Sequence, residues 1–185
     1  MTVIVGIAGS LRKASFNAAL LRVAGERMPA GSELHIASID GVPLYDADVE
    51  AESGVPAAVA RLKDAVAGAQ GLLIATPEYN NSLPGVLKNA IDWMSRPSRD
   101  QARVFQGKPV AIMGATPGGM GTALAQAAWL PVMRSLGLRW YTGGLLYVSR
   151  AASVFGPDGG LADPALGERI DKYLAGFLEF VNGRA

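Results

Sequence analysis

Three short apolar runs, each broken off by glycine or proline, constrain the fold more than any other feature of the chain. The runs are Val3–Ala8, Gly71–Thr76 and Val110–Gly114, and none of them contains a charged residue. Runs of this length favour strands over helices. A strand that is apolar on both faces is typical of a parallel sheet with helices on both sides. The sequence therefore predicts a buried parallel sheet.

Amphipathic segments alternate with these runs. Glu33–Ile39 and Trp140–Val148 are expected to add two more strands. The expected helices are Asn17–Met28, Val55–Ala69, Leu83–Met94, Thr122–Leu136 and a C-terminal helix that Asp163 and Pro164 open as N-cap and first-turn proline. Five strands alternating with helices predict an α/β, doubly wound parallel sheet. No repeat or linker divides the chain, so residues 1–185 are expected to form a single domain.

The composition excludes several classes of function. The chain has 17 basic and 16 acidic residues and a net charge of +1, so no strong field is available to hold nucleic acid or an anionic membrane. It has no cysteine, which excludes thiolate nucleophiles and zinc–thiolate sites, and its one histidine, His35, excludes metal sites built on several histidines. The uncharged stretch Pro109–Met133 is interrupted by prolines and glycines and does not read as one membrane helix. We expect a soluble, cytoplasmic protein that either takes its chemistry from a bound cofactor or performs none.

The loop after the first strand has the composition of a phosphate cradle. Parallel sheets bind ligands beyond the carboxyl ends of their strands, and a helix N-terminus attracts anions. This loop leads into a helix and carries the Ser10 and Ser15 hydroxyls, the Arg12 guanidinium and the Asn17 amide. It matches neither the dinucleotide fingerprint nor the nucleotide-hydrolase P-loop, and therefore suits a terminal phosphate monoester. The alternative is an ordinary strand-to-helix loop in which Ser15 is a helix cap.

The loops after the third and fourth strands suit a flat ligand. In Thr76–Ser82, a proline stops the strand, and amides and one aromatic ring follow. In Thr116–Thr122, three glycines allow the backbone to approach a planar group closely. Each loop could instead be a plain turn. Glu78 could be read as a general base, although no partner residue is identifiable for it.

These motifs carry a family resemblance. GSLRKASFN, TPEYNNSLPGVLKNAIDW and ATPGGMGT together resemble the NADPH-dependent FMN reductase family, above all its flavodoxin-like quinone and chromate reductases. The resemblance runs from Val3 to Gly183 and implies a flavodoxin-like fold with strand order 2-1-3-4-5 and bound FMN. It implies that the FMN phosphate is held by Ser10, Arg12, Ser15, Phe16 and Asn17. It implies that the isoalloxazine is lined by Pro77, Glu78, Tyr79 and Asn80 and, at its other edge, by Thr116, Pro117, Gly118 and Gly119.

The implied activity is an NAD(P)H-dependent FMN oxidoreductase that passes hydride from the nicotinamide to FMN and on to a quinone or similar acceptor. Relatives often carry an arginine in the helix after the third loop, whereas here no charge appears before Arg134, so the residues that grip NAD(P)H stay unassigned. One alternative is a flavodoxin-type electron carrier, although such carriers are usually strongly acidic. Another is a reductase that releases reduced FMN to a partner monooxygenase or acts on azo or metal-oxyanion acceptors.

Two helices predict self-association. Leu83–Met94 and Thr122–Leu136 carry more apolar surface than one small sheet obviously needs. We expect a homodimer or homotetramer with the flavin near the interface, and no nucleic-acid or membrane partner.

Overall fold

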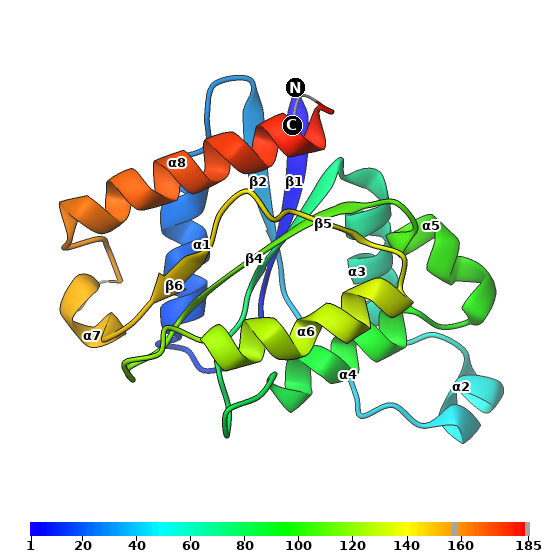
Figure 1. Ribbon diagram of the computed structural model, residues 1–185. Coiled ribbons are helices and arrows are strands. Elements are labelled where there is room, and N and C mark those ends of the chain that lie inside the picture. Colours follow the sequence, from blue (N-terminus) through cyan, green and yellow to red (C-terminus); the bar gives the residue numbers. More distant parts are fainter. Residues whose placement is uncertain (157–158, 184–185) are drawn as a thin grey trace.

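The structure, a computed structural model, describes residues 1–156 and 159–183. Its strands are β1 (Thr2–Ala8), β2 (Ser32–Ala37), β3 (Gly71–Ala75), β4 (Pro109–Ala115), β5 (Arg139–Trp140) and β6 (Leu146–Val148). Its helices are α1 (Phe16–Glu26), α2 (Ala47–Ser53), α3 (Ala57–Gly68), α4 (Gly85–Met94), the 3-10 turn η1 (Ser98–Asp100), α5 (Gln101–Phe105), α6 (Ala123–Ser135), α7 (Ala151–Val154) and α8 (Pro164–Val181). Figure 1 shows the strands running between two groups of helices.

The strands form one parallel sheet in the order β2-β1-β3-β4-β5, with β6 also paired to β4. This arrangement confirms the predicted flavodoxin-like order 2-1-3-4-5. Because all the strands are parallel, the loops that follow β1, β3 and β4 emerge at the same edge of the sheet. The topology therefore brings the three predicted motifs together.

The prediction of one continuous strand over Trp140–Val148 was wrong. β5 pairs with the start of β4 and β6 with its end, and the pairing is interrupted between them, after the Tyr141 N–H donates to the Val110 carbonyl oxygen at 2.9 Å. Here Tyr141 is buried against the rings of Tyr173 and Phe177 on α8. A Cβ at Gly143 would lie 2.6 Å from the Tyr141 ring, so the close packing of this turn requires glycine. The aromatic contact with α8 thus overrides the local strand pattern.

Each face of the sheet has its own hydrophobic core. Ile4, Leu73 and Met113 belong to the cluster that packs against α1 and α8. Leu72 and Ile74, which alternate with them, belong to the cluster that packs against α3, α4 and α6 (Figure 1). Successive side chains of a strand point to opposite faces. A strand that contributes to both cores therefore has apolar residues at every position.

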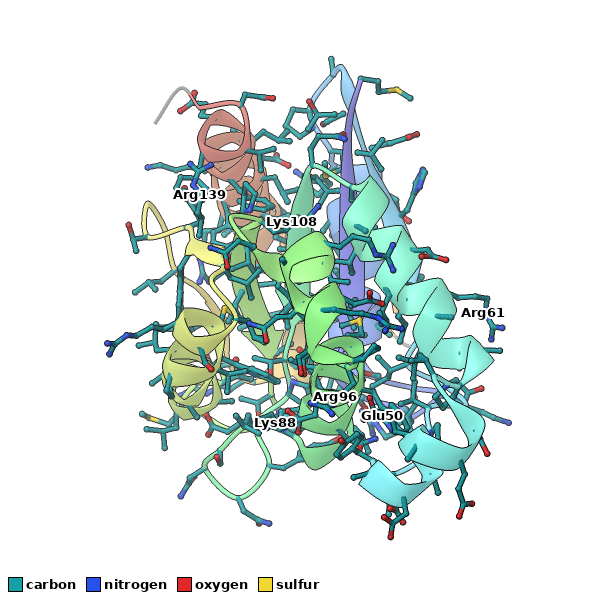
Figure 2. All side chains as sticks on the ribbon, turned by 90° about the vertical axis from the view of Figure 1, so that its right-hand side faces the viewer. Glu50, Arg61, Lys88, Arg96, Lys108 and Arg139 are labelled. Carbon is teal, nitrogen blue, oxygen red and sulfur yellow. The ribbon has the colours of Figure 1, made fainter. Side chains whose placement is uncertain are left out.

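Ion pairs outside the three loops connect the smaller helices to the rest of the fold. Arg96, after α4, donates from Nε to Glu50 of α2 at 2.9 Å, and Figure 2 shows the two side chains beside each other. The bond from Arg96 holds the pKa of the Glu50 carboxyl below its ordinary value. The buried Lys63 of α3 pairs with Asp100 at 2.6 Å and lowers the pKa of that carboxyl. These contacts fasten α2 and α3 to the segment that follows α4.

The long uncharged stretch of the sequence divides as expected. Residues 109–133 form β4, a glycine-containing loop and most of α6. Within the described ranges, no helix is long and apolar enough to cross a membrane.

Candidate functional site

The three loops after β1, β3 and β4 meet around a pocket of about 220 Å³. The residues that line it come from all three: Ser10, Arg12, Ser15, Phe16, Asn17, Pro77, Glu78, Tyr79, Ala115, Thr116 and Pro117. The family resemblance implies a site role for each of these except Ala115, which is the last residue of β4 and the first of the third motif. Asn80, Gly118 and Gly119 are exposed at the tips of their loops and lie outside this lining.

The loop after β1 forms one end of the pocket. Ser15 is the N-cap of α1, and its Oγ accepts a hydrogen bond from the Ala18 backbone N–H at 3.3 Å. The cap reading therefore holds, and it is compatible with anion binding because a capped helix still directs its first N–H groups outward. Arg12 is exposed, and its guanidinium carbon lies 5.3 Å from the centroid of the Phe16 ring. This end of the pocket combines a helix N-terminus with a cation.

The Asn17 side chain joins this loop to β4. Its Nδ2 donates to the Ala115 carbonyl oxygen at 2.9 Å, and its Oδ1 accepts from the Ala115 N–H at 2.9 Å. The residue is buried, so both ends of the amide are satisfied away from water. Asn17 thus fixes the position of the loop after β1 relative to the loop after β4, and its amide is already engaged.

The loop after β3 is a tight hairpin. Tyr79 and Ser82 form an antiparallel bridge, and the two residues between them, Asn80 and Asn81, have φ of 50° and 59°. Positive φ at both central residues is the type I′ geometry, in which asparagine is favoured. The turn holds Tyr79 at the edge of the pocket, where its hydroxyl donates a long hydrogen bond of 3.4 Å to Ser10 Oγ.

Glu78, in the loop after β3, caps the helix α6 that follows β4. Its Oε2 accepts hydrogen bonds from the backbone N–H groups of Leu124 and Ala125 at 2.9 and 3.1 Å. Thr122, the N-cap residue of α6, has φ of 67° and makes no capping bond from its own side chain. A carboxylate at a helix N-terminus also interacts favourably with the helix dipole. Glu78 therefore links the loop after β3 to the helix after β4, and a role as general base would compete with these two bonds.

We predict that Glu78→Ala lowers the melting temperature by roughly 2–8 °C, because loss of a cap costs about 1–2 kcal/mol and each kcal/mol shifts a chain of this size by roughly 2–4 °C. Glu78→Gln keeps an acceptor oxygen and should lose less. Calorimetry measures both, with Glu168→Ala, at an exposed residue of α8, as the matched control. An alanine variant that melts with the wild type would rule out the capping role.

The glycines of the loop after β4 differ in whether the surrounding chain leaves room for a side chain. Gly121 has φ of 59°, and a Cβ there would lie 2.7 Å from Tyr147 Cβ, so this glycine is needed for packing. A Cβ at Gly119 would have no atom of the described chain within 4 Å, and one at Gly118 would only reach Thr116 Oγ1 at 3.7 Å. The chain itself leaves open space beside these two residues. Packing within the described chain therefore does not require glycine at either position.

Comparisons with known proteins agree with this geometry. A family model described as NADPH-dependent FMN reductase matches residues 2–153. Over 171 residues the chain is 43% identical to the NAD(P)H-dependent FMN reductase of Pseudomonas aeruginosa, covering 92% of this chain and 90% of that protein. It is 38% identical over 173 residues to a 2-hydroxy-1,4-benzoquinone reductase of Burkholderia sp., covering 94% and 90%. The solved structure of FerB, a flavoenzyme NAD(P)H:(acceptor) oxidoreductase from Paracoccus denitrificans, superposes with a TM-score of 0.88 at 32% identity, covering 100% of this chain and 99% of that one.

The matched range includes all three loops of the pocket, and the relatives are named as reductases. The protein is accordingly an oxidoreductase, and the alternative of a flavodoxin-type electron carrier is not supported. The expected cofactor, FMN, and the expected reductant, NAD(P)H, are those of the family. From its sequence, its fold and the loops that meet at this pocket, the chain belongs to the NADPH-dependent FMN reductase family.

Proposed function

We propose that the protein uses bound FMN to transfer two electrons from NAD(P)H to a quinone. The observation that carries this proposal is the pocket in which the loops after β1, β3 and β4 meet, with a helix N-terminus and a cation at one end and peptide groups and an aromatic ring at the other. The named activity of the Burkholderia relative supports a quinone as the acceptor. The overall reaction balances as NAD(P)H, one proton and a quinone giving NAD(P)⁺ and a hydroquinone.

The residues of the loop after β1 would bind the FMN phosphate. The first N–H groups of α1 and the hydroxyls of Ser10 and Ser15 would donate hydrogen bonds, and Arg12 would neutralise charge. The Ser15 hydroxyl can donate to phosphate while its oxygen continues to accept from Ala18. Binding the phosphate here orients the rest of the cofactor toward the other two loops.

The loops after β3 and β4 would hold the ring system. Pro77 and Tyr79 would line one edge, and the backbone of Thr116–Gly119 the other. Bound there, FMN would supply the two-electron chemistry between NAD(P)H and the acceptor, and the protein would contribute orientation and electrostatics. The Glu78 cap and the Asn17 bridge keep the three loops at a fixed separation, which preserves the orientation of the ring.

The visible spectrum of the FMN-loaded protein under nitrogen tests this proposal. Addition of NADH or NADPH should bleach the flavin band, and a quinone added afterwards should restore it. A buffer addition without nucleotide is the control. Protein that stays colourless after incubation with FMN, or loaded protein that neither nucleotide bleaches, would refute the proposed function.

We also propose a cytoplasmic location, because the reductant, NAD(P)H, is a cytoplasmic metabolite.

We further propose a homodimer, or a pair of dimers, built on α6. Leu124 and Leu130 on this helix are 41% and 48% exposed, and Met120 just before it is 61% exposed. On α4, by contrast, the apolar face is mostly buried in the chain's own core, and Val86 is its one large apolar side chain among the exposed residues described. Glu78 ties the start of α6 to the pocket, so a partner seated there would lie beside the flavin.

We predict that Leu130→Glu converts the assembly to monomers, because a carboxylate in an apolar interface must be desolvated without a partner. Light scattering coupled to gel filtration measures the mass. Leu44→Glu, at a residue that is 85% exposed and lies before α2, is the matched control and should leave the mass unchanged. A wild-type protein that is monomeric at micromolar concentration would contradict the proposed interface.

A further inference from the structure

A second and larger cavity, of about 650 Å³, adjoins the phosphate end of the pocket. The two share Arg12, Ser15 and Phe16. The larger cavity extends from there along α1 to the segment around α7, and none of its described lining residues comes from the loops after β3 or β4. A ligand that entered it from the pocket would therefore extend beyond the phosphate of FMN rather than beyond its ring.

The lining of this cavity combines cations with aromatic rings. Arg12, Lys13 and Arg22 supply the positive charge, and no described lining residue is acidic. Phe16 and Phe155 stack with their centroids 6.1 Å apart and form an apolar wall. The volume lies in the range of roughly 300–1,000 Å³ that is usual for small-molecule sites. The cavity thus suits an anionic group joined to a flat aromatic one.

We propose that this cavity receives the adenylate half of FAD, so that the chain binds FAD as well as FMN. FAD is FMN with adenosine monophosphate joined to its phosphate, so its second phosphate must lie directly next to the first. That position is at the boundary that Arg12 and Ser15 share between the two cavities. Lys13 and Arg22 would pair with the pyrophosphate, and the adenine would pack against Phe155. The inference rests on the proposed function, because it takes the phosphate of FMN to lie at the start of α1.

The adenylate end of NAD(P)H fits the cavity less well. Its nicotinamide has to reach the flavin ring, which the loops after β3 and β4 would hold, and neither loop contributes to the cavity. A dinucleotide with its adenine in the cavity would have to cross the bound flavin phosphate. The adenylate of FAD is already attached at that point.

The test titrates flavin-free protein with FMN and with FAD, following the quenching of flavin fluorescence. We expect FAD to bind within threefold of FMN or more tightly. FAD that binds more than 100-fold more weakly than FMN would overturn this inference and leave the proposed function intact. If neither flavin binds, both fail together.

Two variants separate the cavity from the pocket. Arg22→Glu places a negative charge in the cavity, and Ala152→Phe fills part of it, and neither residue lines the pocket. Each should weaken FAD binding at least tenfold and FMN binding less than threefold. Arg61→Glu, an exposed residue of α3 with the same change of charge, should alter neither.

Equal losses for both flavins in Arg22→Glu would show that the cavity does not distinguish them and would overturn the inference. The inference would also be overturned if Arg22→Glu left the ratio of the FAD and FMN affinities unchanged but raised the KM for NADPH. That result would assign the cavity to the dinucleotide substrate.

Discussion

Replacing Ser15 by aspartate should leave the protein folded and unable to retain FMN. Aspartate is as good an N-cap as serine, so its carboxylate can accept the hydrogen bond from Ala18 and preserve α1. Ser15 is buried and lines the pocket, where a carboxylate in its place would face the phosphate dianion. Two like charges about 4 Å apart repel by roughly 4 kcal/mol at an effective dielectric constant of about 20, which corresponds to about a thousandfold loss of affinity.

Equilibrium dialysis against FMN measures the loss, and circular dichroism verifies that the variant is folded. Ser15→Asn is the matched control, since asparagine caps helices equally well and adds no charge. Retention of FMN by a folded Ser15→Asp variant would show that the phosphate is bound elsewhere. Loss of FMN by both variants to the same extent would show that the hydroxyl matters and the charge does not.

The parts of the fold that follow from local pattern could be predicted from the sequence. Three uncharged runs can be strands only if both of their faces are covered, and they form β1, β3 and β4 as expected. Asp163 caps α8 with its side chain on the Ala165 N–H, as the Asp-Pro pair had indicated. The strand order itself came from the family resemblance, because hydrophobic periodicity does not specify which strands are neighbours.

What the sequence could not predict depends on contacts between distant residues. The strand ends after Tyr141, whose backbone still bonds to β4 while its ring packs against rings on α8 that lie far along the chain. Glu78 is 46 residues from the helix it caps, so no local capping pattern identifies it. The short helix α2 is a further example, since Asp46 caps it but its position depends on the ion pair between Glu50 and the distant Arg96.

The candidate site shows the same division. The motifs indicated which loops meet, and parallel topology made their meeting certain. They could not distinguish side chains that face the pocket from those that hold it together. The resemblance implies that Asn17 holds the phosphate, whereas its side-chain amide forms two hydrogen bonds with Ala115 of β4. No motif indicates the cavity beside the phosphate end, because it is formed with the segment around α7.

The Asn17 bridge should be the strongest single polar support of the site. Asn17→Ala would leave the N–H and the carbonyl oxygen of Ala115 without partners in a buried position. Each unsatisfied group costs about 1–3 kcal/mol, so for two groups we expect a loss of about 2–6 kcal/mol and a melting temperature lower by roughly 4–24 °C. Calorimetry measures this, with Asn182→Ala at the exposed end of α8 as the matched control.

Flavin affinity measured well below the melting temperature of the Asn17→Ala variant distinguishes two roles. If the bridge only stabilises the fold, the folded variant should bind FMN as the wild type does. If the bridge also sets the distance between the loops after β1 and β4, FMN affinity should fall about tenfold or more. The phosphate and the ring would contact different loops, so a small displacement of one loop would weaken the contacts of both parts of the cofactor. We expect the second result. A variant as stable as the wild type would mean that water replaces the amide, and that the loops are positioned by β1 and β4 alone.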